Sequence, residues 1–184
     1  VTVEQALSIA AQNNLSLKSA RLNEEAGSKY KRSWLDIGKT SVTAEYGQIN
    51  TIYNDTRIGI SQGFSFPGVY VQQKRLLNQN YLATQTETRL TAIELSAQVK
   101  SLYYQLLAMR EKQKLLLYAD SIYEAFLQKA TLRYEKGETN LLEKSTAAAS
   151  RSQVANQLQL LQSDMQVALQ QFNRLLNDSV PYQP

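Results

Sequence analysis

A single glycine, Gly137, interrupts a very long stretch that otherwise contains no residue that breaks helices. Neither glycine nor proline occurs from 69 to 136 or from 138 to 180. Both residues disfavour helix interiors, since glycine loses more backbone entropy and proline lacks an N–H. The sequence therefore predicts two long helices that meet at one corner. At about 1.5 Å per residue the first would span on the order of 100 Å, so it must pair along its length.

The second long helix carries an apolar heptad pattern, with spacings that alternate between four and three residues. Its members are Val154, Leu158, Leu161, Met165, Ala168, Phe172 and Leu175. Apolar residues between 95 and 116 recur at the same spacing in the first helix. Gly137 has the place of a left-handed helix C-terminus, and Asn140 that of the next N-cap. We therefore expect a mainly α fold, an elongated antiparallel coiled-coil helical hairpin.

The N-terminal part predicts two shorter helices. Thr2 and Gln5 form a capping-box pattern, which predicts a short helix that ends near Asn13. A medium helix is expected from about Ser16 to Ile37, with Gly38 as its left-handed C-terminal residue. The expected organisation has four parts: helices in 1–38, a β-hairpin in 39–67, the long helical hairpin with its turn at 137–140 in 68–178, and a tail in 179–184.

Between the helices, the hydrophobic period changes to two, which indicates β-strands. Four apolar residues share one face, Ile58, Ile60, Phe64 and Phe66, with Gln62 as the exception on that face. The run 41–48 alternates too, and "YNDT" at 53–56 is expected to form the turn. Each strand would have roughly the 9–11 residues that cross a bilayer. Pattern alone leaves two interpretations open: barrel strands with these four residues facing lipid, or a soluble β-flap over the helices.

The composition excludes several classes of catalytic and metal-binding site. The chain has no cysteine and no histidine, which removes thiol nucleophiles, disulfides and the usual zinc ligands. No phosphate-binding loop or nucleophile motif occurs, so we expect neither an enzyme nor a cofactor or metal site. The net charge of +4 is spread over the chain, and we expect no nucleic-acid binding. The one basic cluster, at 29–32 near Trp34, is expected to be a solvated helix face, with a membrane-boundary anchor as the alternative.

Two segments carry a family resemblance. "VTVEQALSIAAQNNLSLKSARL" resembles the opening of TolC-like outer-membrane efflux proteins, and "LRYEKGETNLLEKSTAAASRSQVANQLQLLQSDMQVALQQFNRLLN" resembles the returning helix of that family. The order of helices and strands matches the family's structural repeat over essentially the whole chain to Asp178. The segment 39–67 is most similar to members from heavy-metal-type RND efflux systems.

The resemblance implies a passive export conduit in the outer membrane and periplasm of a Gram-negative bacterium. The strands would join a β-barrel among outer-membrane lipids, and the helices would form a periplasmic tunnel, with 16–37 and 141–176 stacked alongside 69–136. The corner would meet a periplasmic adaptor protein that works with an inner-membrane RND pump. The candidate contact residues are Arg133, Tyr134, Gly137, Glu138, Thr139 and Leu141, although the same residues would also suit a purely structural corner.

The family carries two such repeats per chain and assembles as trimers, whereas this sequence holds one repeat. Either it is half of a longer protein or six copies are needed for one barrel, and we expect the former. The alternative from another functional class is a soluble coiled-coil adaptor or scaffold that binds a partner through the helical corner. Substitution of Ile60 or Phe64 by arginine should separate the two.

Overall fold

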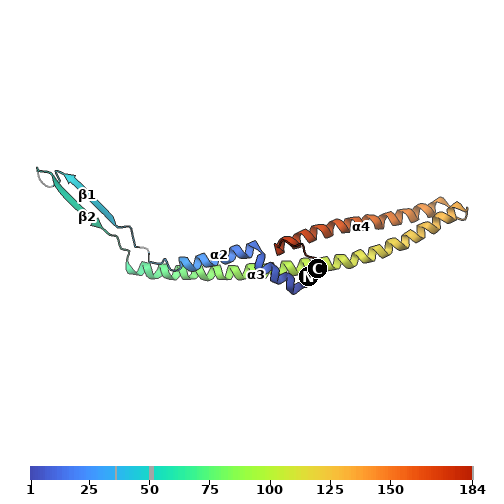
Figure 1. The fold of residues 1–184 in the computed structure, drawn as a ribbon, viewed down its shortest axis with the longest axis horizontal. Helices are drawn as coiled ribbons and strands as arrows, with labels where there is room; N and C mark the ends of the chain where they lie inside the picture. Colours follow the sequence, from blue (N-terminus) through green and yellow to red (C-terminus); the bar gives the residue numbers. More distant parts are fainter. Residues whose placement is uncertain (36, 50–51, 184) are drawn as a thin grey trace. The chain divides into compact units, whose positions relative to one another are not determined.

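The computed structural model describes residues 1–35, 37–49 and 52–183. Within them the chain forms the helices and strands α1 (Val3–Asn13), α2 (Leu15–Tyr30), β1 (Ser41–Gly47), β2 (Asp55–Ser61), α3 (Pro67–Glu135) and α4 (Leu141–Leu176) (Figure 1). The chain divides into two compact units. The first unit contains 1–18 and 91–184, and the second contains 19–90, so α2 and α3 contribute to both. The predicted mainly α fold with one inserted β-hairpin is confirmed.

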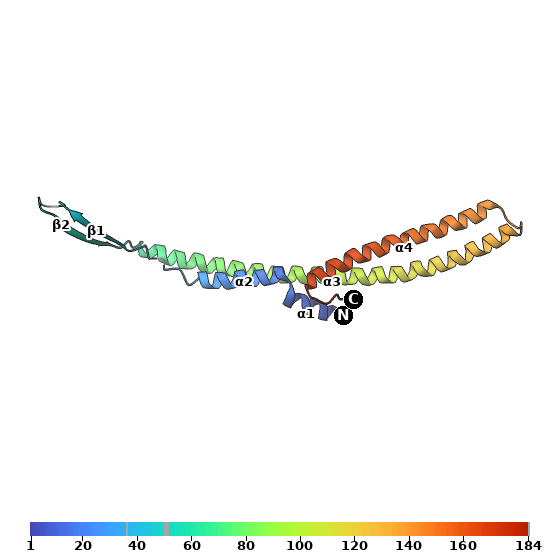
Figure 2. The same ribbon diagram turned by 45° about the horizontal axis from the view of Figure 1, so that its top comes forward.

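In the first unit, α4 runs antiparallel to the C-terminal part of α3, and Figure 2 shows the two side by side. Arg133 of α3 pairs with Glu143 of α4 at 2.9 Å. Further along, Arg151 of α4 reaches back to Glu124 at 3.3 Å and Asp120 at 3.5 Å. Because the residue numbers along α4 increase while those of their partners on α3 decrease, the two helices run antiparallel. The predicted helical hairpin is therefore present.

The core of the first unit follows the predicted heptad positions of α4. Val154, Leu161, Ala168 and Phe172 are buried, and Leu158, Met165 and Leu175 are half-buried. Facing them on α3 are buried leucine and valine side chains, at positions 95, 99 and 106. The small side chains Ala6 and Ala10 bring α1 into the same cluster. Burial of a stripe of this kind is the main source of stability for a paired helix.

Polar contacts fix where α1 ends and α2 begins. Thr2 and Gln5 form the predicted capping box. Asn14, which is nine-tenths buried, donates a hydrogen bond from Nδ2 to the carbonyl of Leu175 at 3.0 Å. Its Oδ1 accepts from the N–H groups of Ser16 and Leu17, so it also caps α2. This side chain joins the α1–α2 corner to the end of α4.

In the second unit, α2 lies along the N-terminal part of α3. The Thr88 hydroxyl donates to the carbonyl of Ala20 at 3.2 Å. At Gly27 a Cβ atom would come within 3.1 Å of the Thr84 hydroxyl oxygen, so the close approach of the helices favours glycine there. None of the described residues of 19–90 is buried. The described part of the second unit therefore has no apolar core of its own.

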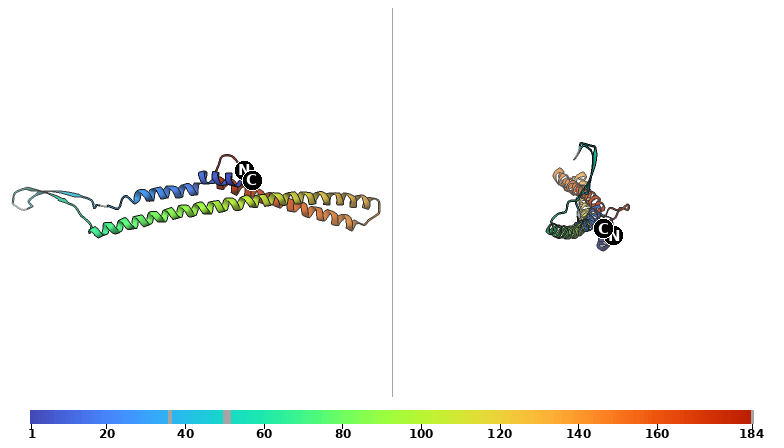
Figure 3. Two further views of the ribbon diagram at one scale, coloured as in Figure 1. Left: turned by 90° about the horizontal axis from the view of Figure 1, so that it is seen from below. Right: turned by 90° about the vertical axis from the view of Figure 1, so that its left-hand side faces the viewer.

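The strands of the second unit form one antiparallel pair, in which Ser41 lies opposite Ser61 and Gly47 opposite Asp55. This register places Val42, Ala44, Ile58 and Ile60 on one face. Figure 3 shows the strands as a two-stranded ribbon with no helix of this unit lying against its faces. Both faces are thus open to solvent within this chain.

The predicted end of the medium helix is wrong. α2 ends at Tyr30, not Ile37, and residues 31–34 form turns. The backbone tightens there, since Arg32 N–H bonds to the carbonyl of Lys29 at 3.0 Å. The Ser33 hydroxyl also donates to the Tyr30 carbonyl at 2.8 Å, which satisfies one of the free groups at the helix end. Gly38 has no positive φ and is therefore not a left-handed C-terminal residue.

The predicted strand bounds are also too wide. β2 ends at Ser61, so Phe64 and Phe66 lie beyond it, and each strand has 7 residues. Directly after the last pair, the Gln62 side chain accepts a hydrogen bond from the Thr40 hydroxyl and donates one to the carbonyl of Gly38. The predicted turn "YNDT" is displaced, since Asp55 and Thr56 already belong to β2. α3 then begins at Pro67, the first-turn position that suits proline.

None of the helices in the described ranges is both long and apolar enough to cross a bilayer.

Candidate functional site

The corner between α3 and α4 is built by a Schellman motif. Gly137 has φ +71°, the left-handed region that favours glycine. The N–H of Glu138 bonds to the carbonyl of Arg133 at 2.8 Å, and the N–H of Gly137 to that of Tyr134 at 3.0 Å. Asn140 then caps α4, since its side chain accepts from the N–H of Glu143 at 3.0 Å. The predicted left-handed residue at Gly137 and the predicted N-cap at Asn140 are both confirmed.

Side-chain contacts across the corner hold the two helix ends together. The Glu143 carboxylate accepts hydrogen bonds from Arg133, at 2.9 Å, and from the hydroxyl of Thr139. Lys144 Nζ lies 5.2 Å from the ring centre of Tyr134, a cation–π contact. The sequence analysis selected neither Glu143 nor Lys144 as a contact residue. Helical spacing could not reveal either contact, because both cross from one helix to the other.

The six predicted contact residues all lie at this corner. Leu141 is exposed, as is its neighbour Leu142 at 72%, which the sequence analysis did not select. Gly137 and Glu138 are exposed too, and Thr139 is half-buried. The corner therefore presents two leucine side chains beside a glutamate–arginine pair, a mixture suited to contact with another protein. That a periplasmic adaptor protein binds this corner remains a prediction.

The second candidate surface is the apolar face of the β-hairpin. Ile58 and Ile60 are paired with Ala44 and Val42, and all four side chains are exposed. The other face is polar, with Arg57 Nη1 lying 3.5 Å from Glu45 Oε2. At Gly59 a Cβ atom would come within 2.8 Å of the Thr43 hydroxyl oxygen, so the Thr43 side chain lies over the glycine on this face. One apolar and one polar face is the pattern of a strand between lipid and water.

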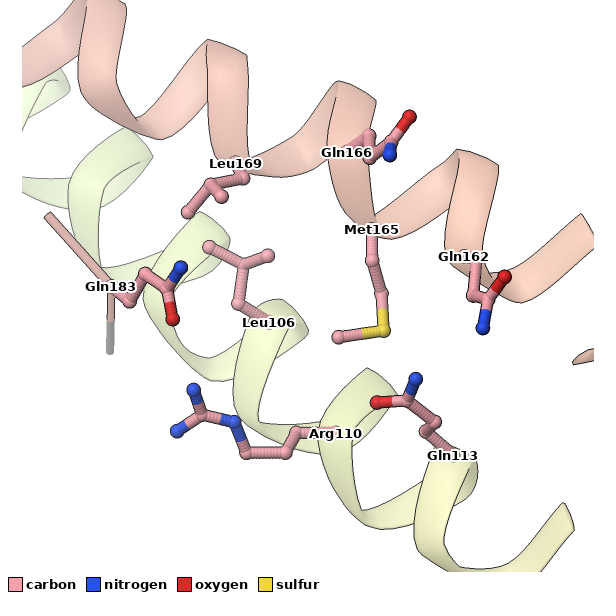
Figure 4. A pocket seen from close by; sticks show the side chains of 8 residues that line it. All are labelled: Leu106, Arg110, Gln113, Gln162, Met165, Gln166, Leu169 and Gln183. Carbon is pink, nitrogen blue, oxygen red and sulfur yellow. The ribbon is translucent and has the colours of Figure 1, made fainter. Parts of the chain in front are cut away.

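A hollow of about 260 Å³ lies between α3 and α4 in the first unit. Its lining is shown in Figure 4: Leu106, Arg110, Gln113, Gln162, Met165, Gln166, Leu169 and Gln183. Leu106 and Leu169 face each other across the helices, and Met165 points towards Gln113, where the apolar pattern of α3 is interrupted. An apolar layer beside a mixed methionine–glutamine layer packs less tightly, which explains the hollow as a packing feature of the heptad seam.

Charged groups do not gather into a reactive site in the described part of the chain. No cluster of three or more potential metal-ligating carboxylates occurs among the described residues. In the tail, Tyr182 donates a hydrogen bond to Asp178 at 2.8 Å. This bond lowers the pKa of the Asp178 carboxyl, and it raises the pKa of the Tyr182 hydroxyl. Asp178 is exposed, whereas Tyr182 is half-buried against the core of the first unit, so the pair fastens the tail to that unit.

Comparison with solved structures identifies the fold. The chain superposes on a membrane protein from Pseudomonas aeruginosa with a TM-score of 0.83 at 17% identity, covering 99% of this chain and 47% of the other. The superposition on the outer membrane channel CmeC of Campylobacter jejuni has a TM-score of 0.80 at 16% identity, and it covers 97% of this chain and 41% of CmeC. The superposition on CusC, which is described as forming a transmembrane channel, has a TM-score of 0.78 at 19% identity. It covers 99% of this chain and 44% of CusC.

No protein-family model matches the sequence, and no curated protein is significantly similar to it. The chain spans less than half the length of each of these three proteins. A single helix–hairpin–helix repeat fits that share of the length. The chain thus has the fold of one half of a TolC-like outer-membrane channel, as its two resembling segments predict.

Proposed function

We propose that this chain is one repeat of the outer-membrane component of a tripartite efflux system, a passive export conduit across the periplasm and outer membrane. The observation that carries the proposal is the exposed apolar face of the β-hairpin, which no described residue of its unit covers. The fold of the whole chain is similar to that of solved channel structures, which supports a membrane setting for this face. Unpaired strand edges are not tolerated in lipid, so hairpins from several repeats would close into one barrel. Two repeats in each of three chains, or six single repeats, would satisfy this requirement.

The apolar face of the hairpin can be tested by two adjacent substitutions. Ile60 is on the apolar face and Ser61 on the polar one, and both are exposed. Ile60→Arg should weaken membrane insertion by about 2–4 kcal/mol, because a lipid-facing cation must leave water. Ser61→Arg adds the same charge on the face proposed to line the lumen and should insert normally. Flotation with phospholipid vesicles and single-channel conductance measure both variants.

If both variants insert equally, or if the parent chain remains in solution while still binding a partner through its corner, the soluble scaffold is the better explanation. In that case Ile60→Arg would have only a small effect on stability, since the side chain is 75% exposed.

The corner at Gly137 is proposed as the contact for a periplasmic adaptor protein of an RND system. Leu141 and Leu142 offer apolar area, and the Arg133–Glu143 pair offers directional hydrogen bonds. Leu142→Glu should lower binding of a purified adaptor, measured by calorimetry, while leaving the helical content unchanged. The control Leu160→Glu changes an equally exposed leucine away from the corner. Equal losses from both substitutions would argue against a specific contact at the corner.

A further inference from the structure

A basic hollow of about 460 Å³ lies in the second unit, separate from the hairpin face and from the corner. The described residues that line it are Lys31, Arg32, Trp34, Lys74, Arg75 and Asn78. Four of the six are cations, and none is an acid. Residues 31–34 come from the turns after α2, and the other three come from the first turns of α3. The fold therefore brings two basic pairs, distant in sequence, to one place.

The positive charges of the hollow meet no neutralising acid among the described residues. Lys74 Nζ lies 5.4 Å from the ring centre of Trp34, and Lys31 Nζ lies 4.8 Å from that of Tyr81. These cation–π contacts hold two ammonium groups in place without removing their charge. None of the four cations forms a salt bridge with a described residue, whereas the neighbouring Lys29 pairs with Glu25 at 2.8 Å. Like charges that line one hollow repel each other, so an anion between them would relieve the repulsion.

The position of the hollow along the chain indicates what kind of anion would fill it. Trp34 lies a few residues before β1, and Lys74 lies about two helical turns after Pro67, where the chain leaves the hairpin. The hollow is therefore at the end of the α2–α3 pair that leads into the strands. If the strands enter a bilayer, this end lies at the membrane–water boundary, where tryptophan and basic side chains collect.

We propose that this hollow binds the phosphate of an anionic phospholipid headgroup. Arg32 and Arg75, which make no cation–π contact in the described structure, offer planar N–H pairs that suit two phosphate oxygens. The half-buried Trp34 would pack its ring beside the glycerol and upper acyl region. The choice of a membrane lipid over other phosphates rests on the proposed function. The site would set the depth at which the hairpin enters the membrane.

Trp34 is the only tryptophan in the chain, so its fluorescence reports on this site alone. Vesicles of equal parts phosphatidylcholine and phosphatidylglycerol should shift its emission to shorter wavelength, and vesicles of phosphatidylcholine alone should do so much less. The double variant Arg32→Gln/Arg75→Gln should bind the anionic vesicles about fivefold more weakly for each charge removed, roughly 30-fold in total. It keeps both cation–π contacts, so its circular dichroism should equal that of the parent.

The matched control is Lys112→Gln/Lys129→Gln, which removes two exposed charges from the first unit. It should leave vesicle binding nearly unchanged. An equal loss in both double variants would overturn the site, because net charge would then explain the binding. Inorganic phosphate that reproduced the full emission shift without vesicles would likewise overturn the assignment to a lipid.

Failure of this site is distinguishable from failure of the proposed function. If Ile60→Arg abolishes conductance while Arg32→Gln/Arg75→Gln binds vesicles as the parent does, the lipid site is wrong and the channel proposal stands. If the arginine pair controls vesicle binding but no variant or parent inserts, the site is supported and the channel proposal is overturned.

Discussion

The two units of this chain bury their apolar side chains to very different extents. In the first unit, helices α1, α3 and α4 share a cluster that includes Val99, Phe172 and Leu176, all fully buried. In the second unit, large apolar side chains such as Ile60 and Phe66 are at least three-quarters exposed. An exposed apolar face of this kind marks a surface that other molecules cover. The comparison teaches that the first unit buries a core of its own, while under the proposed function the second unit would depend on lipid and on further repeats.

The largest expected effect separates two phenylalanines, one from each unit. Phe172 is fully buried and its ring lies 6.3 Å from that of Tyr103, whereas Phe64 is 74% exposed. Phe172→Ala should lower the free energy of unfolding by about 3–5 kcal/mol, because it leaves a cavity. Phe64→Ala should change it by less than about 0.5 kcal/mol in water. Urea denaturation followed by helical circular dichroism measures both, and similar losses would erase the proposed difference between the units.

A second comparison concerns two glycines with open space around them. A Cβ atom would meet nothing within 4 Å at either Gly137 or Gly63, but only Gly137 has a positive φ, at +71°. Gly137→Ala should therefore cost about 1–2 kcal/mol through backbone strain alone. Gly63→Ala should be neutral or stabilising by up to about 1 kcal/mol, because it restricts the unfolded chain. Thermal unfolding of the two variants tests this, and a harmless Gly137→Ala would contradict the described corner.

The smallest expected effect concerns the charges between α3 and α4. Arg151 lies within 3.5 Å of both Asp120 and Glu124, and all three side chains are partly exposed. Arg151→Gln should cost about 1 kcal/mol or less, and the difference should disappear in about 1 M salt. Arg174→Gln, on the same helix without a salt bridge to a described residue, is the control. A loss that salt does not reduce would indicate a packing role for Arg151 instead.

Much of the fold was predictable where local chemistry decides the structure. Gly137 and Asn140 carry their own turn and cap signals, and the seam from Val154 to Leu175 needs only helical spacing. The end of α2 was not predictable in this way. No glycine or proline occurs between Tyr30 and Gly38. The turns at 31–34 go with contacts to α3, such as Lys74 over Trp34. Contacts of this kind join residues far apart in the chain, so the sequence pattern does not predict them.

The end of β2 shows a weaker signal that sequence reasoning undervalued. Gln62 was the one exception on the apolar face, and it is the residue at which pairing stops. At the corner, the contacts of Glu143 and Lys144 were missed because they join two helices. The basic hollow likewise unites residues 31–32 with 74–75, and only the folded second unit places them together.

Amide hydrogen exchange across the chain, in water and in phospholipid vesicles, tests the central difference between the units most directly. The amides of α4 near Phe172 and of α3 near Val99 should be protected in both conditions, since their helices share a buried core. The amides of β1 and β2 should exchange rapidly in water, because an isolated two-stranded hairpin is marginally stable, and should become protected in vesicles. Strand amides that are as protected in water as those of α4, or that stay unprotected in vesicles, would contradict the account.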